Sequence, residues 1–388
     1  MDPLIARFDS VEDGDLVLCR GRGVARQRDM SFRAPPGVNA VGENYFDHYA
    51  ALAGGEIGQL IHAARRDIVD RHAGREACVL DVGIGSGEFI QARPNTLGLD
   101  INPRGIEWLR REGKLADGVE GFEAYTFWDV LEHIDQPYRH YFRFMKDGAW
   151  LFTSLPIFSD LDTVRGSKHY KPGEHLYYWM EQGFVDWMAA WRFRLVERSD
   201  VESEAGREGI VSFAFRRDLP DYNSTLDQYR EIHSRAYGTT AYLYFDQIAR
   251  EVMSRQPVSI LDWGCGRSDL VAHFWNEGRR RIAKYDPAIP QFKRLPEGQF
   301  DLALVCDVME HILLCDVERV LEEIKTKARD AIFTISLRPA RAKLPDGRNA
   351  HVTLLTASEW SRWVKSIFRR AIRVDTGQDH LLMLKTFG

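Results

Sequence analysis

Residues 79–87 of the chain read VLDVGIGSG, and a related stretch, ILDWGCG, recurs at residues 260–266. Each is a short apolar run that ends in Asp-x-Gly-x-Gly. A second motif follows each of them, DVLEHI at residues 129–134 and DVMEHI at residues 307–312. The Asp that opens the second motif lies 48 residues after the Asp of the first motif in one half, and 45 residues after it in the other. This shared spacing predicts two nucleotide-cofactor domains in tandem.

The composition is that of an ordinary globular protein. A chain of 388 residues that is 44% hydrophobic and 28% charged has room for two or three domains. We find no secretion-signal pattern and no window of about 18 apolar residues, so we expect a cytoplasmic protein without membrane contact. The five cysteines form no Cys-x-x-Cys pair, which argues against a disulfide framework or a zinc knuckle.

The net charge of −5 provides no general attraction to nucleic acid. Two local segments, residues 20–33 and 338–348, are nevertheless rich in arginine and lysine. One interpretation of each is a solvated basic loop, and the other is a surface that contacts phosphates.

The pattern along the chain predicts an irregular extension over residues 1–40, a first domain over 41–220 and a second domain over 221–388. Helical spacing of apolar residues begins at residues 45–72, and residues 226–254 resemble it in the second half. Short apolar runs then predict strands at 77–82, 97–100, 125–129, 149–155, 193–197 and 210–215, and again at 259–263, 282–286, 302–306, 331–336, 371–374 and 381–384. Strands that alternate with helices favour parallel sheets covered by helices on both faces.

The glycine turns indicate what kind of ligand they receive. Glycines at a turn from strand to helix allow the backbone to approach a ligand that a Cβ would block. Dinucleotide-binding turns have an apolar residue two positions before the first glycine, whereas this chain has Asp81 and Asp262 there. A carboxylate repels a pyrophosphate but suits the amino group of S-adenosylmethionine, which has no phosphates. A second acid follows, Asp100 or Asp286, and can accept hydrogen bonds from both ribose hydroxyls.

On these motifs, both halves resemble class I S-adenosylmethionine-dependent methyltransferases. The resemblance implies two tandem Rossmann-like α/β domains, each a mostly parallel seven-stranded sheet with helices on both faces. The cofactor-binding residues that it implies are Asp81, Gly83, Gly85, Gly87, Asp100 and Asp129 in the first half, and Asp262, Gly264, Gly266, Asp286 and Asp307 in the second. Ser268 takes the place of the third glycine in the second half, so the first half matches the family better. Only 28 residues separate Asp100 from Asp129, which predicts a shortened adenine-binding segment.

Histidines recur in both halves. Glu132 and His133 follow Asp129 at i+3 and i+4, as Glu310 and His311 follow Asp307, which on a helix would put glutamate and histidine on one face. Two later histidines follow, His175 at 42 residues after His133 and His351 at 40 residues after His311. These four histidines are the candidate catalytic residues. A neutral histidine near the methyl group would be a general base toward a hydroxyl or amine acceptor.

A metal is a second interpretation of the same residues. Asp129, Glu132, His133 and His175 are a plausible ligand set for Mg²⁺ or Mn²⁺. We do not expect a metal, because the metal-dependent methyltransferases that this layout resembles have Glu where this chain has Asp129 and Asp307. Glu-His-Ile at this place is also frequent among methyltransferases without a metal, where the histidine has a metal-free role or the residues support the fold or the cofactor.

Three functions remain open at this point. The first is methyl transfer from S-adenosylmethionine to oxygen or nitrogen of a small molecule or saccharide by both halves. The second is modification of nucleic acid, of a phage-type base or an RNA ribose, suggested by the basic segments. The third is one catalytic half joined to a non-catalytic scaffold half. The oligomeric state and the identity of the acceptor are not predicted.

Overall fold

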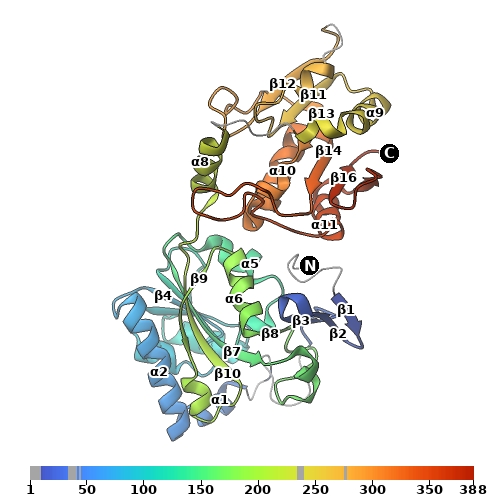
Figure 1. Ribbon diagram of the computed structural model, residues 1–388. Helices are drawn as coiled ribbons and strands as arrows, with labels where there is room; N and C mark the ends of the chain where they lie inside the picture. Colours follow the sequence, from blue (N-terminus) through green and yellow to red (C-terminus); the bar gives the residue numbers. More distant parts are fainter. Residues whose placement is uncertain (1–9, 34–41, 43–44, 234–239, 275–277) are drawn as a thin grey trace. The chain divides into compact units, whose positions relative to one another are not determined.

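The computed structural model describes residues 10–33, 42, 45–233, 240–274 and 278–388. The chain divides into two compact units, Met1–Leu219 and Pro220–Gly388 (Figure 1). Each unit contains its own sheet with helices packed against it. Within the described residues, no helix is long and apolar enough to cross a membrane.

The first unit is built on a mixed sheet. In spatial order its central strands are β5 (Thr96–Leu99), β4 (Val79–Val82), β6 (Ala124–Trp128), β7 (Trp150–Phe158), β10 (Ile210–Arg216) and β9 (Arg194–Ser199). The first four are parallel, and β10 and β9 are antiparallel to their neighbours. The carboxyl ends of the parallel strands therefore meet at one edge, where both sequence motifs begin.

Helices cover both faces of this sheet. Ala214 of β10 packs in a cluster with Val69 of α2 (Glu56–Ala73), whereas its neighbour Phe213 lies against Phe184 of α6 (Glu181–Ala190). Successive strand residues point to opposite faces, so α2 and α6 lie on opposite sides. The shorter helices are α1 (Tyr45–Ala53), α3 (Glu88–Ala92), α4 (Pro103–Arg111), α5 (Pro137–His140) and α7 (Val201–Glu204).

The second unit repeats the central arrangement. Its strand order is β12 (Arg281–Tyr285), β11 (Ser259–Trp263), β13 (Phe300–Cys306), β14 (Ala328–Ser336), β16 (Leu381–Lys385) and β15 (Ile372–Val374). Ile332 packs with Ile248 of α9 (Phe245–Arg255) on one face, and Phe333 packs against Phe368 of α11 (Ala357–Phe368) on the other. The remaining helices are α8 (Tyr222–His233) and α10 (Val317–Lys327).

The expectation of seven strands in each central sheet is wrong. Among the described residues, the second sheet has six strands and the central part of the ten-stranded first sheet also has six, because no strand lies between β5 and β6 or between β12 and β13 along the chain. After α4 the first unit keeps only an isolated parallel bridge between Leu115 and Gly98. In the second unit the short connection from β12 to β13, residues 286–299, forms neither helix nor strand. The shortened segment seen in the sequence is therefore the loss of one strand.

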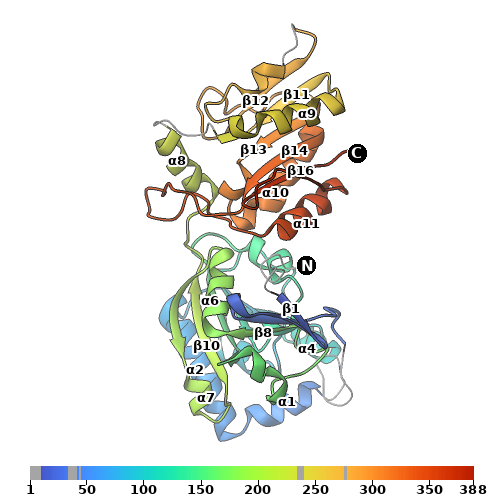
Figure 2. The same ribbon diagram turned by 45° about the vertical axis from the view of Figure 1, so that its right-hand side comes forward.

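The prediction of an irregular N-terminal extension is also wrong for the residues that the structure describes. Strands β1 (Ser10–Asp13), β2 (Leu16–Cys19) and β3 (Val24–Gln27) form an antiparallel ribbon that joins β8 (Tyr177–Met180), and β8 pairs with the end of β7 (Figure 2). Four-residue strands are too short to show a period. The rest of that extension, residues 1–9 and 34–40, lies outside the described residues.

One helix also differs from expectation. Helix 45–72 is two helices, α1 and α2, separated at Gly54 and Gly55, two residues that weaken a helix. The aromatic run Tyr177–Trp179 forms strand β8, and all three side chains are buried.

We predict that Gly183→Ala destabilises the first unit by about 1–3 kcal/mol. A Cβ on Gly183 of α6 would lie 2.3 Å from the carbonyl oxygens of Arg22 and Gly23, so the turn before β3 would have to move away from α6. Urea denaturation measures the change. In the control Gly118→Ala, the new methyl would meet no atom of the described residues within 4 Å, and equal midpoints for the two variants would contradict this packing.

Candidate functional site

The two motifs are in contact through the first glycine of each turn. Gly83 and Gly264 have φ of +74° and +72°, which glycine adopts without strain. A Cβ on Gly83 would lie 2.6 Å from Cγ2 of Val130, and one on Gly264 would lie 2.4 Å from Cγ2 of Val308. Val130 and Val308 are the second residues of the DV(L/M)EHI motifs. The packing of each turn against its second motif therefore requires glycine in both halves.

The second glycine of each turn has a different role. Gly85 and Gly266 have φ of +57° and +53°. A Cβ on either would meet no atom of the described residues within 4 Å. These two glycines thus leave a strip of backbone open to a ligand, as the cofactor interpretation requires.

At the third position the halves differ in how the next helix begins. Gly87 has φ of +86° and packs its Cα face against Trp108, whose ring would lie 2.7 Å from an added Cβ. It leads into α3. In the second unit the buried Ser268 accepts the N–H of Leu270 at 3.0 Å and begins the 3-10 helix Leu270–Phe274. Ser268 therefore replaces one helix start with another and leaves the preceding turn intact.

The acids before the glycine turns are buried. Asp81 accepts a hydrogen bond from Thr126 Oγ1 at 2.5 Å, and burial raises its pKa to about 7. Burial also raises the pKa of Asp262 to about 7. Leu304 stands opposite Asp262 where Thr126 stands opposite Asp81, and Asp262 Oδ2 has no hydrogen-bond partner among the residues that the structure describes.

The acids after the second strands support the turns directly. Asp100 accepts the backbone N–H groups of Ile84 and Asn102 at 2.9 and 2.7 Å. Asp286 accepts those of Gly266 and Ala288, both at 2.8 Å. Each carboxylate oxygen retains a further lone pair for a ligand hydroxyl.

A cavity of about 730 Å³ in the second unit collects the expected residues of that half. Its lining includes all the predicted cofactor residues and both predicted catalytic histidines of the second half: Asp262, Gly264, Gly266, Asp286, Asp307, His311 and His351. Ser268, Arg338 and Arg341 also line it. The sequence prediction for this half therefore corresponds to one connected space.

The second motifs do not lie on α-helices, contrary to expectation. Asp129 and Asp307 have positive φ, +58° and +53°, and single-turn 3-10 helices follow, Leu131–His133 and Met309–His311. The left-handed residue turns the chain sharply at the strand end. Glutamate and histidine consequently stand beside each other on a tight turn.

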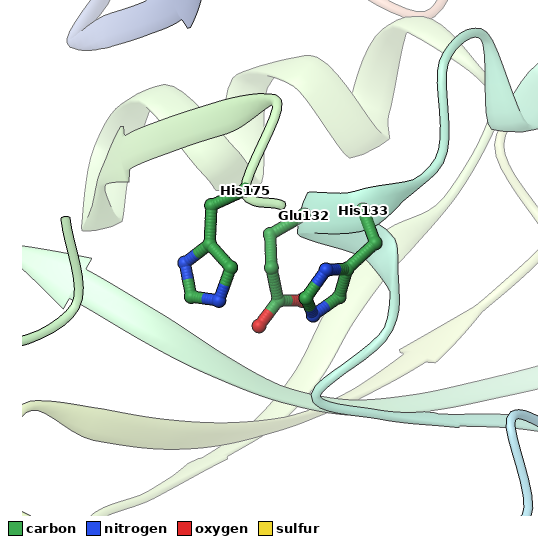
Figure 3. A group of neighbouring side chains, drawn as sticks. All are labelled: Glu132, His133 and His175. Carbon is green, nitrogen blue, oxygen red and sulfur yellow. The ribbon is translucent and has the colours of Figure 1, made fainter. Parts of the chain in front are cut away.

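In each half this turn brings together a glutamate and two histidines. Potential ligand atoms of Glu132, His133 and His175 lie within 4.8 Å of one another (Figure 3), and the two rings meet edge to face with centroids 4.7 Å apart. The corresponding set in the second unit is Glu310, His311 and His351, with ring centroids 4.9 Å apart. We call these sets the Glu–His–His clusters.

Burial sets the protonation of these groups. It lowers the pKa of His133 and His351, and it lowers the pKa of His175 well below its usual value. These rings are therefore neutral at pH 7. Burial also raises the pKa of Glu132 and Glu310 well above their usual range.

Asp129 does not join the cluster of its half, so its place in a metal ligand set is wrong. Its carboxylate is paired with Arg65 and Arg207, both at 2.9 Å, and these arginines also hold the fully buried Glu202. Although burial opposes it, Arg207 and Arg65 hold the pKa of Asp129 well below its usual range. The one sequence signal for this network is Arg65, a charge four residues from Ile61 and three from Ile68 on the apolar face of α2.

Asp307 has a different environment from Asp129. Its Oδ1 accepts a hydrogen bond from Thr334 Oγ1 at 3.1 Å, whereas its buried Oδ2 is without a hydrogen-bond partner in the described part of the chain. Burial raises its pKa to about 6. Asp307 is thus available to a ligand in the cavity, and the two halves are not equivalent.

Residues 53–198 match a family model described as a methyltransferase domain. This part of the first unit is therefore similar to methyltransferase domains. The matched segment lies within the first unit and contains both motifs of that half. No curated protein matches the chain.

Solved structures similar to the chain include two methyltransferases. One is 1,6-didemethyltoxoflavin-N1-methyltransferase of Burkholderia thailandensis, with 18% identity over 45% of this chain and 84% of that chain, at a TM-score of 0.34. Another is a possible histamine N-methyltransferase of Thermotoga maritima, with 14% identity over 45% of this chain and 95% of that chain, also at 0.34. Likeness at this level carries no information on the acceptor.

We predict that Arg65→Ala destabilises the first unit by about 3–5 kcal/mol, because it leaves Glu202 and Asp129 with one charged partner, the half-buried Arg207. The control Arg71→Ala removes exposed pairs from the same helix, with Asp67 and Glu197, and should cost less than about 1 kcal/mol. Chemical denaturation compares them. Similar losses for both variants would show that the buried network does not stabilise the fold.

Proposed function

We propose that both units bind S-adenosylmethionine and that each transfers its methyl group to oxygen or nitrogen of a small-molecule or saccharide acceptor. For the first unit the support is the matched methyltransferase domain together with its open glycine turn. For the second unit the support comes from the chemistry of its cavity.

The observation that carries the proposal is a set of uncompensated carboxylates in that cavity. Asp262 Oδ2, Asp307 Oδ2 and Glu310 Oε2 are buried, and none has a hydrogen-bond partner among the described residues. All three side chains line the same space. Burying such groups without partners is costly. A ligand with an amino group and a sulfonium would supply the missing positive charge and donors, which favours a working cofactor site over a scaffold.

The proposed reaction is an in-line displacement. An acceptor lone pair forms a bond to the methyl carbon while the carbon–sulfur bond breaks, and its electrons remain on the sulfur of S-adenosylhomocysteine. Proximity and orientation account for most of the acceleration. The acceptor proton is taken up at the Glu–His–His cluster, where neutral His133 or His175 in the first unit, and His311 or His351 in the second, is the expected base.

The size of the cavity supports a small acceptor. About 730 Å³ lies within the range of small-molecule sites and has to hold the cofactor as well. Arg338 and Arg341, from the loop after β14, line the cavity and provide polar groups for contact with the acceptor.

The surroundings of the basic segments favour a small acceptor over nucleic acid. In residues 20–33, Arg20 pairs with Asp162, Arg28 with Glu12 and Arg33 with Asp29. In residues 338–348, Arg348 pairs with Asp346, while Arg338 and Arg341 line the cavity. Four of the nine basic side chains in these segments are thus paired with acids that the structure describes, which weakens their attraction for phosphates.

We predict that calorimetric titration with S-adenosylhomocysteine finds two sites per chain. Gly85→Ala should remove the first and Gly266→Ala the second, because each new methyl enters the strip of backbone left open to the cofactor. Matched controls are Gly113→Ala and Gly347→Ala, with φ of +64° and +90° and an equally open Cβ position among the described residues. They carry a similar backbone strain but should keep both sites.

One site in the wild-type chain, lost in Gly85→Ala and kept in Gly266→Ala, would make the second unit a scaffold. No site at all would contradict the proposed function. Equal losses in the variants and their controls would assign the effect to backbone strain instead of contact with the cofactor.

A further inference from the structure

We propose that each half binds a divalent transition-metal ion through its Glu–His–His cluster, Glu132, His133 and His175 in the first unit and Glu310, His311 and His351 in the second. The role that we give the ion, next to the methyl acceptor, rests on the proposed function. The binding itself is argued from the side chains alone.

The distances suit a common ion. Ligand atoms about 2.1 Å from one tetrahedral metal stand about 3.4 Å apart. In both clusters the three potential ligand atoms already lie within 4.8 Å of one another. Side-chain rotations that shorten these distances by up to about 1.4 Å therefore complete either site.

Three of the four cluster histidines are oriented as metal ligands are. Nδ1 of His133 donates to the carbonyl of Glu174 at 2.9 Å, that of His311 to Ala350 at 2.7 Å, and that of His351 to Arg338 at 2.6 Å. A carbonyl only accepts, so the proton is on Nδ1 and the lone pair is on Nε2. Metal-binding histidines are fixed in the same way by their second nitrogen.

The glutamates lack donors. Glu132 Oε2 and Glu310 Oε2 are buried and have no hydrogen-bond partner within the described residues, and the same holds for Nδ1 of His175. Glu310 is held by its other oxygen, which accepts the N–H of Ser336 at 2.8 Å. Figure 3 shows the carboxylate of Glu132 lying next to both histidine rings.

In each cluster three acceptors thus converge. A proton on the glutamate could satisfy only one of the two histidines, whereas a cation serves all three groups at once. Burial makes the alternative costly, because Glu132 is 1% exposed, Glu310 0% and His175 4%.

The same construction occurs twice in halves that differ at most positions. His175 precedes β8 in the first unit, whereas His351 lies in a loop before α11 in the second. Both loops nevertheless place a histidine beside the turn that follows β6 in the first unit and β13 in the second. A packing role would be filled by many residue pairs, so the recurrence of two histidines and one glutamate favours a shared ligand.

The ligand types select the ion. Two imidazoles and one carboxylate favour Mn²⁺, Fe²⁺, Co²⁺, Ni²⁺ or Zn²⁺ over Mg²⁺, which prefers oxygen ligands and water. Three protein ligands leave positions open for an acceptor oxygen or nitrogen. With the ion bound, the histidine lone pairs are used for coordination, so the ion takes over the role that the proposed function gives to a free histidine. It would lower the pKa of an acceptor held beside the cofactor, and the acceptor proton would then pass to solvent.

Cobalt titration tests the proposal on the full-length protein after dialysis against a chelator. Visible absorption of bound Co²⁺ and elemental analysis by plasma mass spectrometry should both give two ions per chain. His175→Ala and His351→Ala should each bind one, and the double variant none. The exposed histidines His140 and His273 provide matched controls, and alanine at either should leave two ions bound.

Buried histidines can matter for folding, so a second pair of variants is needed. Glu132→Gln and Glu310→Gln keep the shape of the side chain and remove its charge, and each should weaken one site by more than about 100-fold. Circular dichroism establishes that these variants are folded. Cobalt binding that survives in all cluster variants, or no binding in the wild type, overturns the proposal.

A titration with S-adenosylhomocysteine on the metal-free protein separates the two claims. Cofactor binding without cobalt binding makes the metal inference alone wrong. Cobalt binding at two cluster-dependent sites without cofactor binding supports the metal sites and makes the proposed function wrong.

Discussion

The contact between a glycine and a valine underlies both candidate sites. Gly83 meets Val130, and Gly264 meets Val308, at a distance where no Cβ fits. This contact joins the turn after β4 to the turn after β6 in the first unit, and the turn after β11 to the turn after β13 in the second. It places the cofactor side of each site against the Glu–His–His side, and it explains why the two motifs occur together at a nearly constant spacing.

Charge compensation distinguishes the halves. In the first unit, Arg65 and Arg207 neutralise Asp129 and Glu202 inside the fold. In the second, the equivalent Asp307 keeps a buried oxygen without a partner in the described part of the chain. The sequence suggested that the first half was the better site because of Gly87. The uncompensated carboxylates make the second half at least as strong a candidate for a cationic cofactor.

Much of the central fold was accessible to sequence reasoning, because buried parallel strands are short apolar runs that end at recognisable turns. The missing strand was visible only as a short spacing, since a segment's length does not say which element is lost. The ribbon β1–β3 was missed because its strands are four residues long and depend on pairing with β8, more than 140 residues away. Tertiary contacts of this kind leave no local period.

The site was predicted at the level of residue types but not of partners. Glu132, His133 and His175 were recognised by their spacing, yet Asp129 was grouped with them because its two arginine partners come from distant segments. Such pairings depend on three-dimensional proximity. They determine which carboxylates are neutralised by arginines within the protein and which can bind a ligand.

The central claim is that the repeated motifs build two S-adenosylmethionine sites. Native mass spectrometry of the freshly purified chain, followed by denaturation and identification of the released small molecules, tests it most directly. The account predicts S-adenosylmethionine or S-adenosylhomocysteine, with species carrying up to two per chain. Release of NAD or another phosphate-containing dinucleotide would contradict it.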